Sequence, residues 1–261
     1  MKKFQIRAFF HKYWILYFLT LLITFTMRFY CRVTDSDALT WILAPTTRWA
    51  SFLGSISFDY LPHQGYVNHF YRFLIAPSCS GIRFMTITFL MLVFSFLYQI
   101  PTVKTGYLWF AFSITFSYCT TILVNGIRIV VSIYLPILLE RADLLNGWLN
   151  PDRLHTLIGT VVYFSCLCAI YPIASFICQR VFIRSAKETI KAAPDNLRHG
   201  FKLLVPAFWY LLVVLALPFL KRILQNDWND FGSYAILIIG TCVLISVPVT
   251  LINLHKNQIN I

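Results

Sequence analysis

Long apolar runs separated by short polar segments dominate the pattern of residues along this chain. A run of about 20 mostly apolar residues is long enough to cross the hydrocarbon core of a bilayer as a helix. All ten acidic residues lie outside these runs, as expected if the runs lie in lipid. The pattern predicts an all-α, polytopic membrane helix bundle with six spans. These are Tyr13–Met27, Ile82–Ile100, Tyr107–Val124, Thr156–Cys178, Leu203–Leu220 and Tyr234–Ile252.

Two further apolar segments, Leu39–Ile56 and Ile127–Leu139, need a separate interpretation. The first contains Arg48, and the second is too short for an ordinary crossing. We expect both to be re-entrant or interfacial helices, because full crossings would invert the loops between them. The alternative is that both cross, which gives eight spans. Between the first segment and the next span, 57–77 is expected to form two short strands or a loop.

Composition agrees with a membrane protein and gives it an orientation. The chain is 58% hydrophobic and 12% charged, whereas soluble domains are nearer a quarter charged. Basic residues gather before the first span and in 180–202, so both termini are expected in the cytoplasm. The net charge of +12 is then explained by cytoplasmic loops, and no nucleic acid partner is expected. The basic start followed by an apolar run predicts a retained signal anchor.

The seven cysteines include no CxxC pair and no metal-ligand spacing, so neither a metal nor another cofactor is expected. His63 and His69 are a weak pair of candidate metal ligands in a predicted loop. Most of the cysteines lie in apolar runs, where a thiol is usually a small hydrophobic side chain.

Cys79 is the exception, because it lies where a polar segment meets the second span. We expect it to begin the helix, capped by Ser78 or Ser80, with Gly81 allowing close backbone approach. The helix N-terminus and Arg83, four residues on and on the same predicted face, would favour the thiolate. Arg83 is therefore predicted to steady the thiolate or to bind substrate, unless it only snorkels to the interface.

Two more polar groups border apolar runs at the same predicted, extracytoplasmic side. Asn125 and Arg128 share a helical face, and a guanidinium suits an oxyanion or a carboxylate. His155 opens the fourth span, with Gly159 one turn later on the same face. A cysteine, a histidine and an arginine together form an acyl-transfer set of nucleophile, acid–base and electrostatic stabiliser.

Three ordered motifs, PSCSGIR, NGIRI and HTLIG, resemble those of the exosortase/archaeosortase family of integral-membrane, transpeptidase-like proteins. The resemblance covers about residues 60–170, and the histidine in the third motif favours the bacterial exosortase branch. It implies a catalytic Cys79, with Arg128 as stabiliser and His155 as acid–base. Ser80, Arg83 and Asn125 are the supporting or substrate-binding candidates.

The resemblance also implies a cysteine peptidase or transpeptidase-like enzyme of the cytoplasmic (inner) membrane, with its site on the extracytoplasmic side. Its partners would be exported proteins with a C-terminal motif, a transmembrane helix and a basic tail. An envelope lipid or polysaccharide is the candidate acceptor, in addition to the surrounding membrane lipids. The expected organisation is a catalytic core at 1–185, with its motifs at 77–84, 125–128 and 155–159. A basic cytoplasmic loop at 186–202 and a two-helix hairpin at 203–261 follow.

A non-enzymatic protein, such as a multi-span transporter or an assembly factor for envelope polysaccharide, remains the alternative. Transporters usually hold charged or broken-helix sites near the bilayer midplane. Here the predicted spans contain no carboxylate, and the polar candidates gather at one surface.

Overall fold

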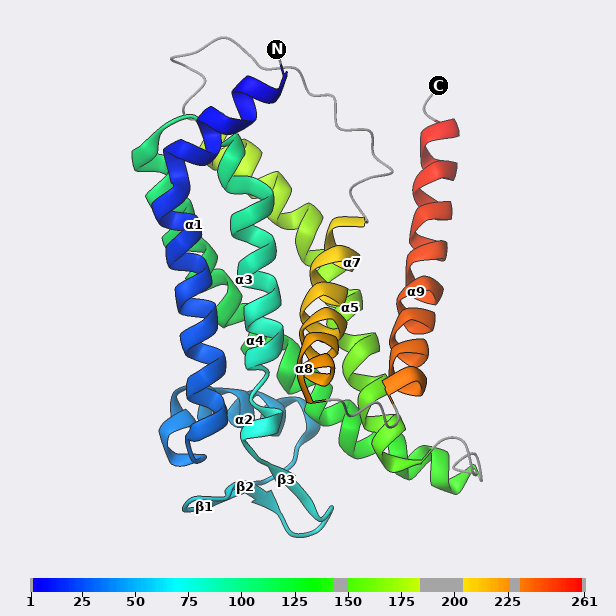
Figure 1. Ribbon diagram of the computed structural model, residues 1–261. Helices are drawn as coiled ribbons and strands as arrows, with labels where there is room; N and C mark the ends of the chain where they lie inside the picture. The colour runs from blue at the N-terminus through cyan, green and yellow to red at the C-terminus, as the bar shows by residue number, and fades with distance from the viewer. Residues whose placement is uncertain (1, 143–149, 184–203, 226–230, 260–261) are drawn as a thin grey trace. The chain divides into compact units, whose positions relative to one another are not determined.

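The computed structural model describes residues 2–142, 150–183, 204–225 and 231–259 (Figure 1). Long helices account for most of it, and the prediction of an all-α membrane helix bundle is confirmed. The longer α-helices are α1 (Lys2–Val33), α2 (Thr40–Gly54), α3 (Ile82–Phe96), α4 (Val103–Arg141), α5 (Pro151–Ile177) and α9 (Phe231–Ile259). The shorter elements are η1 (Asp37–Leu39), η2 (Pro77–Cys79), η3 (Leu97–Gln99), η4 (Cys178–Ile183), α7 (Leu204–Leu211), η6 (Leu212–Ala216) and α8 (Leu217–Gln225).

Four helical segments of the described chain are long and apolar enough to cross a membrane: Lys12–Val33, Pro77–Gln99, Val103–Arg141 and Arg153–Ile183. They coincide with the first four predicted spans. The last two predicted spans correspond to shorter apolar helices, Leu204–Phe219 and Phe231–Val247. The number of crossings, six or eight, stays a prediction, as does the expected domain division. Its basic loop at 186–202 lies outside the described residues.

The chain divides into two compact units, each built from segments that are distant in sequence. The first comprises Met1–Val33, Ile82–Thr121 and Leu167–Trp209. In it α1 packs antiparallel along α3 (Figure 1). The Tyr13 hydroxyl of α1 donates to the carbonyl of Ile100, the residue after η3, at 2.8 Å. α3 is buried on nearly all sides, as expected for a helix that is apolar around its whole circumference.

The second unit comprises Thr34–Gly81, Ile122–Cys166 and Tyr210–Ile261. It contains a three-stranded antiparallel sheet of β1 (Asp59–Leu61), β2 (Gly65–Asn68) and β3 (Phe73–Ile75) (Figure 1). The sequence predicted two strands or a loop in this region, so the third strand is an addition. β3 leads directly into the turn that carries Cys79.

Asp37 holds the η1 turn against β1 and the β1–β2 connection. Its carboxylate accepts hydrogen bonds from the Tyr60 hydroxyl at 2.7 Å and the His63 backbone N–H at 2.8 Å. The Tyr60 bond and then the His63 bond hold the pKa of Asp37 below its ordinary value. His63 also lies 3.2 Å from the same side chain. This histidine therefore has a local partner in the η1 turn.

α4 corrects one sequence-based expectation. The segment Ile127–Leu139 was expected to be a separate re-entrant or interfacial helix, but it continues the preceding span as a single 39-residue helix. A helix of that length extends about 58 Å, roughly twice the hydrocarbon thickness of a bilayer. Asn125 and Arg128 interrupt the hydropathy of the run without interrupting its backbone. The predicted interfacial segment Leu39–Ile56 does form a separate helix, α2.

α2 is attached to the second half of α4 at two points. The Trp49 indole N–H donates to the Leu123 carbonyl at 3.1 Å, and the Tyr134 hydroxyl donates to the Gly54 carbonyl at 2.9 Å. At Gly126 an added Cβ would lie 2.4 Å from the Trp49 ring, so only glycine lets α2 approach so closely. These contacts fix the part of α4 that carries Asn125 and Arg128.

Candidate functional site

Cys79 lies in the short 3₁₀ turn η2, not in the first turn of α3 as the sequence suggested. Its N–H donates to the Ala76 carbonyl at 2.8 Å, and within the described residues no side-chain hydrogen bond caps the start of the turn. The side chain is buried, with 6% of its surface exposed, and Ser78 Oγ lies 4.0 Å from its sulfur. Ser80, the other predicted cap, is buried and closes the turn through its backbone N–H.

Gly81 separates the cysteine turn from α3. Its φ is +75°, a left-handed conformation that side chains rarely adopt, and α3 begins one residue later. The backbone from Cys79 to Arg83 is therefore not a continuous helix, so the predicted shared helical face of Cys79 and Arg83 does not form. Arg83 is exposed at the start of α3.

Asn125 joins the cysteine turn to α4. Its side chain is completely buried, and Nδ2 donates to the Cys79 carbonyl at 2.6 Å. Because a carbonyl oxygen only accepts, this bond fixes the orientation of the amide and turns Oδ1 toward Tyr163. The Tyr163 hydroxyl then donates to Oδ1 at 2.7 Å. A Cβ on Gly81 would lie 2.9 Å from Asn125 Cγ, so the glycine also makes room for the amide.

Tyr163 extends the network from α5 back to the arginine on α4. The Arg128 guanidinium lies over the Tyr163 ring, 5.4 Å from its centroid, in the geometry of a cation–π contact. Arg128 is 7% exposed, so its charge is held mostly away from water. Asn125 and Arg128 thus face the same way, as their spacing predicted, and they meet through the tyrosine rather than directly.

His155 lies near the start of α5. Asn150 caps the first turn of this helix, because its side-chain Oδ1 accepts a hydrogen bond from the Arg153 N–H at 2.8 Å. Arg128 Nη2 and His155 Nε2 are 2.6 Å apart. Arginine has no acceptor, so the histidine nitrogen accepts in this pair. The imidazole is then neutral, with its proton on Nδ1.

Arg128 keeps one donor without a partner. Its Nε is buried and makes no hydrogen bond within the described chain. An added Cβ on Gly159 would lie 3.4 Å from this nitrogen, so the missing side chain leaves the space beside Nε unfilled. A buried donor without an acceptor is costly, and such atoms in native proteins usually signal a ligand, a water or a function.

The structure therefore links the three sequence motifs in one connected network, from the Cys79 carbonyl through Asn125, Tyr163 and Arg128 to His155. Sequence reasoning missed Tyr163. Its spacing was the available signal, because 155, 159 and 163 fall on one helical face at intervals of four residues.

The described residues contain no group of three or more His, Cys, Asp or Glu side chains placed to hold a metal ion. His63 and His69 interact with different aspartates, Asp37 and Asp59 respectively, rather than with each other.

The comparison with protein families matches residues 6–172 to the model described as Transmembrane exosortase (Exosortase_EpsH). This range covers more than half of the chain and contains all three motifs. No curated protein and no solved structure matches the chain. The family match, together with the apolar helices, makes this a membrane protein with a transpeptidase- or protease-type role, and the chain belongs to the transmembrane exosortase family.

Proposed function

We propose that this protein is a cysteine transpeptidase that processes C-terminal sorting signals of exported proteins, with Cys79, Arg128 and His155 as its catalytic residues. The observation that carries the proposal is the chain of contacts from the Cys79 carbonyl to His155 within one structural unit. Residues that are 27 and 46 positions apart in sequence meet by direct hydrogen bonds. Family membership supports the reaction class.

In the first half-reaction the Cys79 sulfur attacks the scissile carbonyl carbon and its proton passes to His155 Nε2. The new C–S bond produces an oxyanion, which the Arg128 guanidinium stabilises. When the oxyanion collapses, the C–N bond breaks and His155 returns the proton to the leaving amine. The product is a thioester on Cys79 and a released C-terminal peptide.

The hydrogen bond between Arg128 and His155 sets the order of these reaction steps. Nε2 of the histidine accepts from Arg128, so it has no lone pair for the thiol proton while that bond persists. A substrate carbonyl that binds Arg128 competes for the same donor and releases Nε2. His155 could then accept the Cys79 proton only after substrate has bound. This order would keep the thiol protonated, and so less reactive, until a substrate is present.

In the second half-reaction an acceptor amine or water attacks the thioester carbonyl. His155 takes the proton of the attacking group and passes it to the departing Cys79 sulfur, which restores the thiol. An envelope lipid or polysaccharide that carries an amine is the proposed acceptor. Asn125 and Tyr163 hold the cysteine turn and the arginine in place, and we assign them positioning rather than catalytic roles.

We place the site on the extracytoplasmic side of the inner membrane. The substrate is a protein with a short motif, a transmembrane helix and a basic tail. A bundle of apolar helices suits such a substrate, because the tail helix can pack beside it in the bilayer. The basic N-terminal segment supports the orientation by the positive-inside rule.

The test is a set of single substitutions, with cleavage of a tagged sorting-signal protein followed in the same cells by pulse-chase. We expect Cys79→Ala to lower the processing rate about a thousandfold or more. Cys178→Ala is the matched control, because Cys178 is also a buried cysteine but lies in the other structural unit. Normal processing by Cys79→Ala would exclude the enzyme mechanism.

The membrane side needs its own experiment. Ser78 and Lys104 are both exposed and flank α3 on its two sides in sequence. In a Cys119→Ser background, Ser78→Cys should react with a membrane-impermeant maleimide in intact cells. Lys104→Cys should react only after permeabilisation. The reverse pattern would show that the orientation is wrong.

A further inference from the structure

Three arginines gather at one end of the α1–α3 pair, within the first structural unit. Arg28 and Arg32 are one turn apart near the end of α1, and Arg83 is near the start of α3. Because α1 and α3 pack against each other, these three positive charges lie at the same end of one helix pair. In the described part of the chain no carboxylate forms an ion pair with any of the three.

Arg28 also has a buried donor with no partner. Its Nη1 is shielded from solvent and makes no hydrogen bond within the described residues. Three like charges with an unsatisfied buried donor are unfavourable for an isolated chain. An anion at this position would remove both costs, because a guanidinium binds phosphate oxygens through parallel N–H donors.

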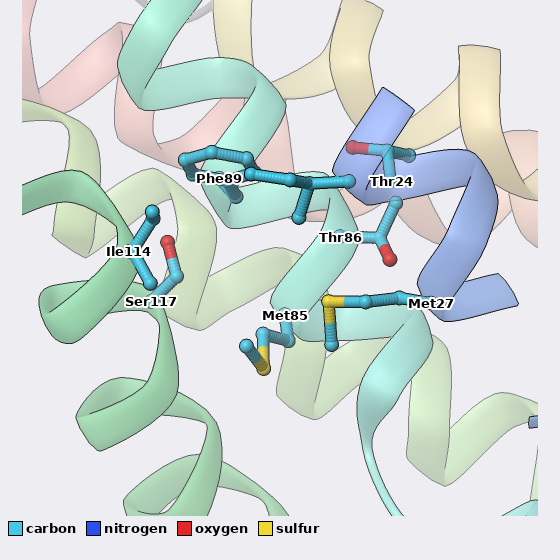
Figure 2. Close-up of a pocket in the computed structure, with 8 residues that line it drawn as sticks. Thr24, Met27, Met85, Thr86, Phe89, Ile114 and Ser117 are labelled. Carbon is cyan, nitrogen blue, oxygen red and sulfur yellow. The ribbon is translucent and has the colours of Figure 1, made fainter. Parts of the chain in front are cut away.

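An apolar notch lies beside this cluster, between α1, α3 and α4 (Figure 2). It is a shallow notch rather than an enclosed cavity. Its exposed lining is apolar, and the residues are Ile23, Thr24, Met27, Met85, Thr86, Phe89, Ile114 and Ser117. The hydroxyls of Thr24 and Thr86 are buried and have no hydrogen-bond partner in the described structure.

Along the axes of α1 and α3, the notch lies about one helical turn from the arginines. Arg28 follows Thr24 by four residues on α1, so the two share a face. Arg83 precedes Thr86 by three residues on α3. Because α1 and α3 run antiparallel (Figure 1), both arginines lie toward the same end of the notch. From that end of the helix pair, the arginines come first, the two threonines follow, and the apolar lining lies beyond them.

We propose that this notch binds an anionic glycerophospholipid, with its phosphate at Arg28 and Arg83 and one acyl chain along the apolar lining. The order of chemistry in such a lipid is phosphate, ester carbonyl, hydrocarbon, which matches the order of groups along the notch. The hydroxyls of Thr24 and Thr86 are buried beneath the lining at the depth of the ester groups, and a rotation of either side chain would let it donate to an ester carbonyl. A free phosphate ion would use the arginines but would leave the hydroxyls and the apolar surface unused.

The experiment measures lipid binding to the purified full chain by native mass spectrometry, with dioleoyl-phosphatidylglycerol and dioleoyl-phosphatidylcholine as probes. We expect tighter binding of the phosphatidylglycerol, and a loss of about fivefold in affinity for each of Arg28→Gln and Arg83→Gln. Lys104→Gln removes an exposed charge near the opposite end of α3 and should leave binding unchanged. Ile114→Trp fills the notch and should weaken binding while the arginines remain.

Each alternative gives a different result. If inorganic phosphate displaces the lipid at equal concentration and Ile114→Trp has no effect, the cluster is a simple anion site and the proposal is wrong. Equal affinity of wild type and Arg83→Gln would also overturn it. Arg83 is exposed at a helix start, so its substitution should not unfold the protein even if Arg28→Gln does. The readout is binding rather than processing, so a failure of the proposed catalytic chemistry would not affect it.

Discussion

Removal of a single hydroxyl from Tyr163 tests whether the contact network serves the reaction or only the fold. Tyr163→Phe deletes the 2.7 Å bond to Asn125 Oδ1 and keeps the ring under the Arg128 guanidinium. Asn125 is fully buried, so its oxygen would lose a partner without gaining water. A buried acceptor left unsatisfied costs about 1–2 kcal/mol, equivalent to a factor of about 5 to 30.

The effect on activity follows from the orientation of the amide. With Oδ1 released, the Asn125 side chain is held only by its bond to the Cys79 carbonyl, and the cysteine turn loses part of its attachment to α4. We expect processing of the sorting-signal substrate to fall about 5- to 30-fold in pulse-chase measurements. Thermal unfolding of the purified protein should report a loss of similar free energy.

A matched variant separates the two roles. Tyr134→Phe deletes another tyrosine hydrogen bond in the same structural unit, to the Gly54 carbonyl, but does not touch the network. It should lower stability without lowering the processing rate of the folded protein. If Tyr163→Phe behaves in the same way as Tyr134→Phe, then the Tyr163 hydroxyl only stabilises the fold and has no positioning role in the reaction.

Three further substitutions test local features of the second unit. Gly159→Ala should raise helix stability by up to about 1 kcal/mol yet slow processing, because the new Cβ occupies the space beside Arg128 Nε; melting and pulse-chase data on one variant would show both. Gly81→Ala should destabilise the protein by about 2 kcal/mol or more in thermal unfolding, because the residue has positive φ and its Cβ would meet the side chain of Asn125; an unchanged melting temperature would contradict this. A tyrosine hydroxyl and a backbone N–H hold the pKa of Asp37 low, so their stabilisation is present above about pH 4 and is lost as the pH falls through the depressed value. Hydrogen exchange of the bonded amide between pH 5 and pH 3 should show this loss, and Asp37→Asn should abolish the pH dependence.

The membrane helices were predictable because lipid imposes a simple rule on length and polarity. Four of the six apolar runs coincide with helices able to cross a bilayer. The continuity of α4 was not predictable in the same way, because Asn125 and Arg128 lower hydropathy at the point where the helix continues. Burial with specific partners makes these residues compatible with the helix, and partners distant in sequence are invisible to a hydropathy pattern. The strand Phe73–Ile75 was missed because three residues are too few to show an alternating pattern.

In the candidate site, too, some residues could be recognised from the sequence and others only from the packing of the helices. Cys79, Arg128 and His155 stand out from the sequence as reactive groups at the edges of apolar runs, whereas Tyr163 lies within a run and resembles the many other aromatic residues there. Its role depends on which hydroxyl faces which amide, and only the packing of α5 on α4 determines that. The helical phase of Arg83 was misjudged for a related reason: a single glycine with positive φ resets the backbone.

Gly81 and Asn125 together explain how a buried thiol is held outside any regular helix. A polar amide with no exposed surface must find partners, and the Cys79 carbonyl is available only because the chain turns before α3 begins. Gly81 makes that turn and at the same time leaves space for the amide. Neither residue is reactive, yet each depends on the other. Without Asn125 the turn loses its hydrogen bond to α4, and without the turn the amide loses the Cys79 carbonyl as its acceptor. The position of Cys79 therefore depends on a pair of residues 44 positions apart, and substitutions at the two should be non-additive, as expected for residues in direct contact.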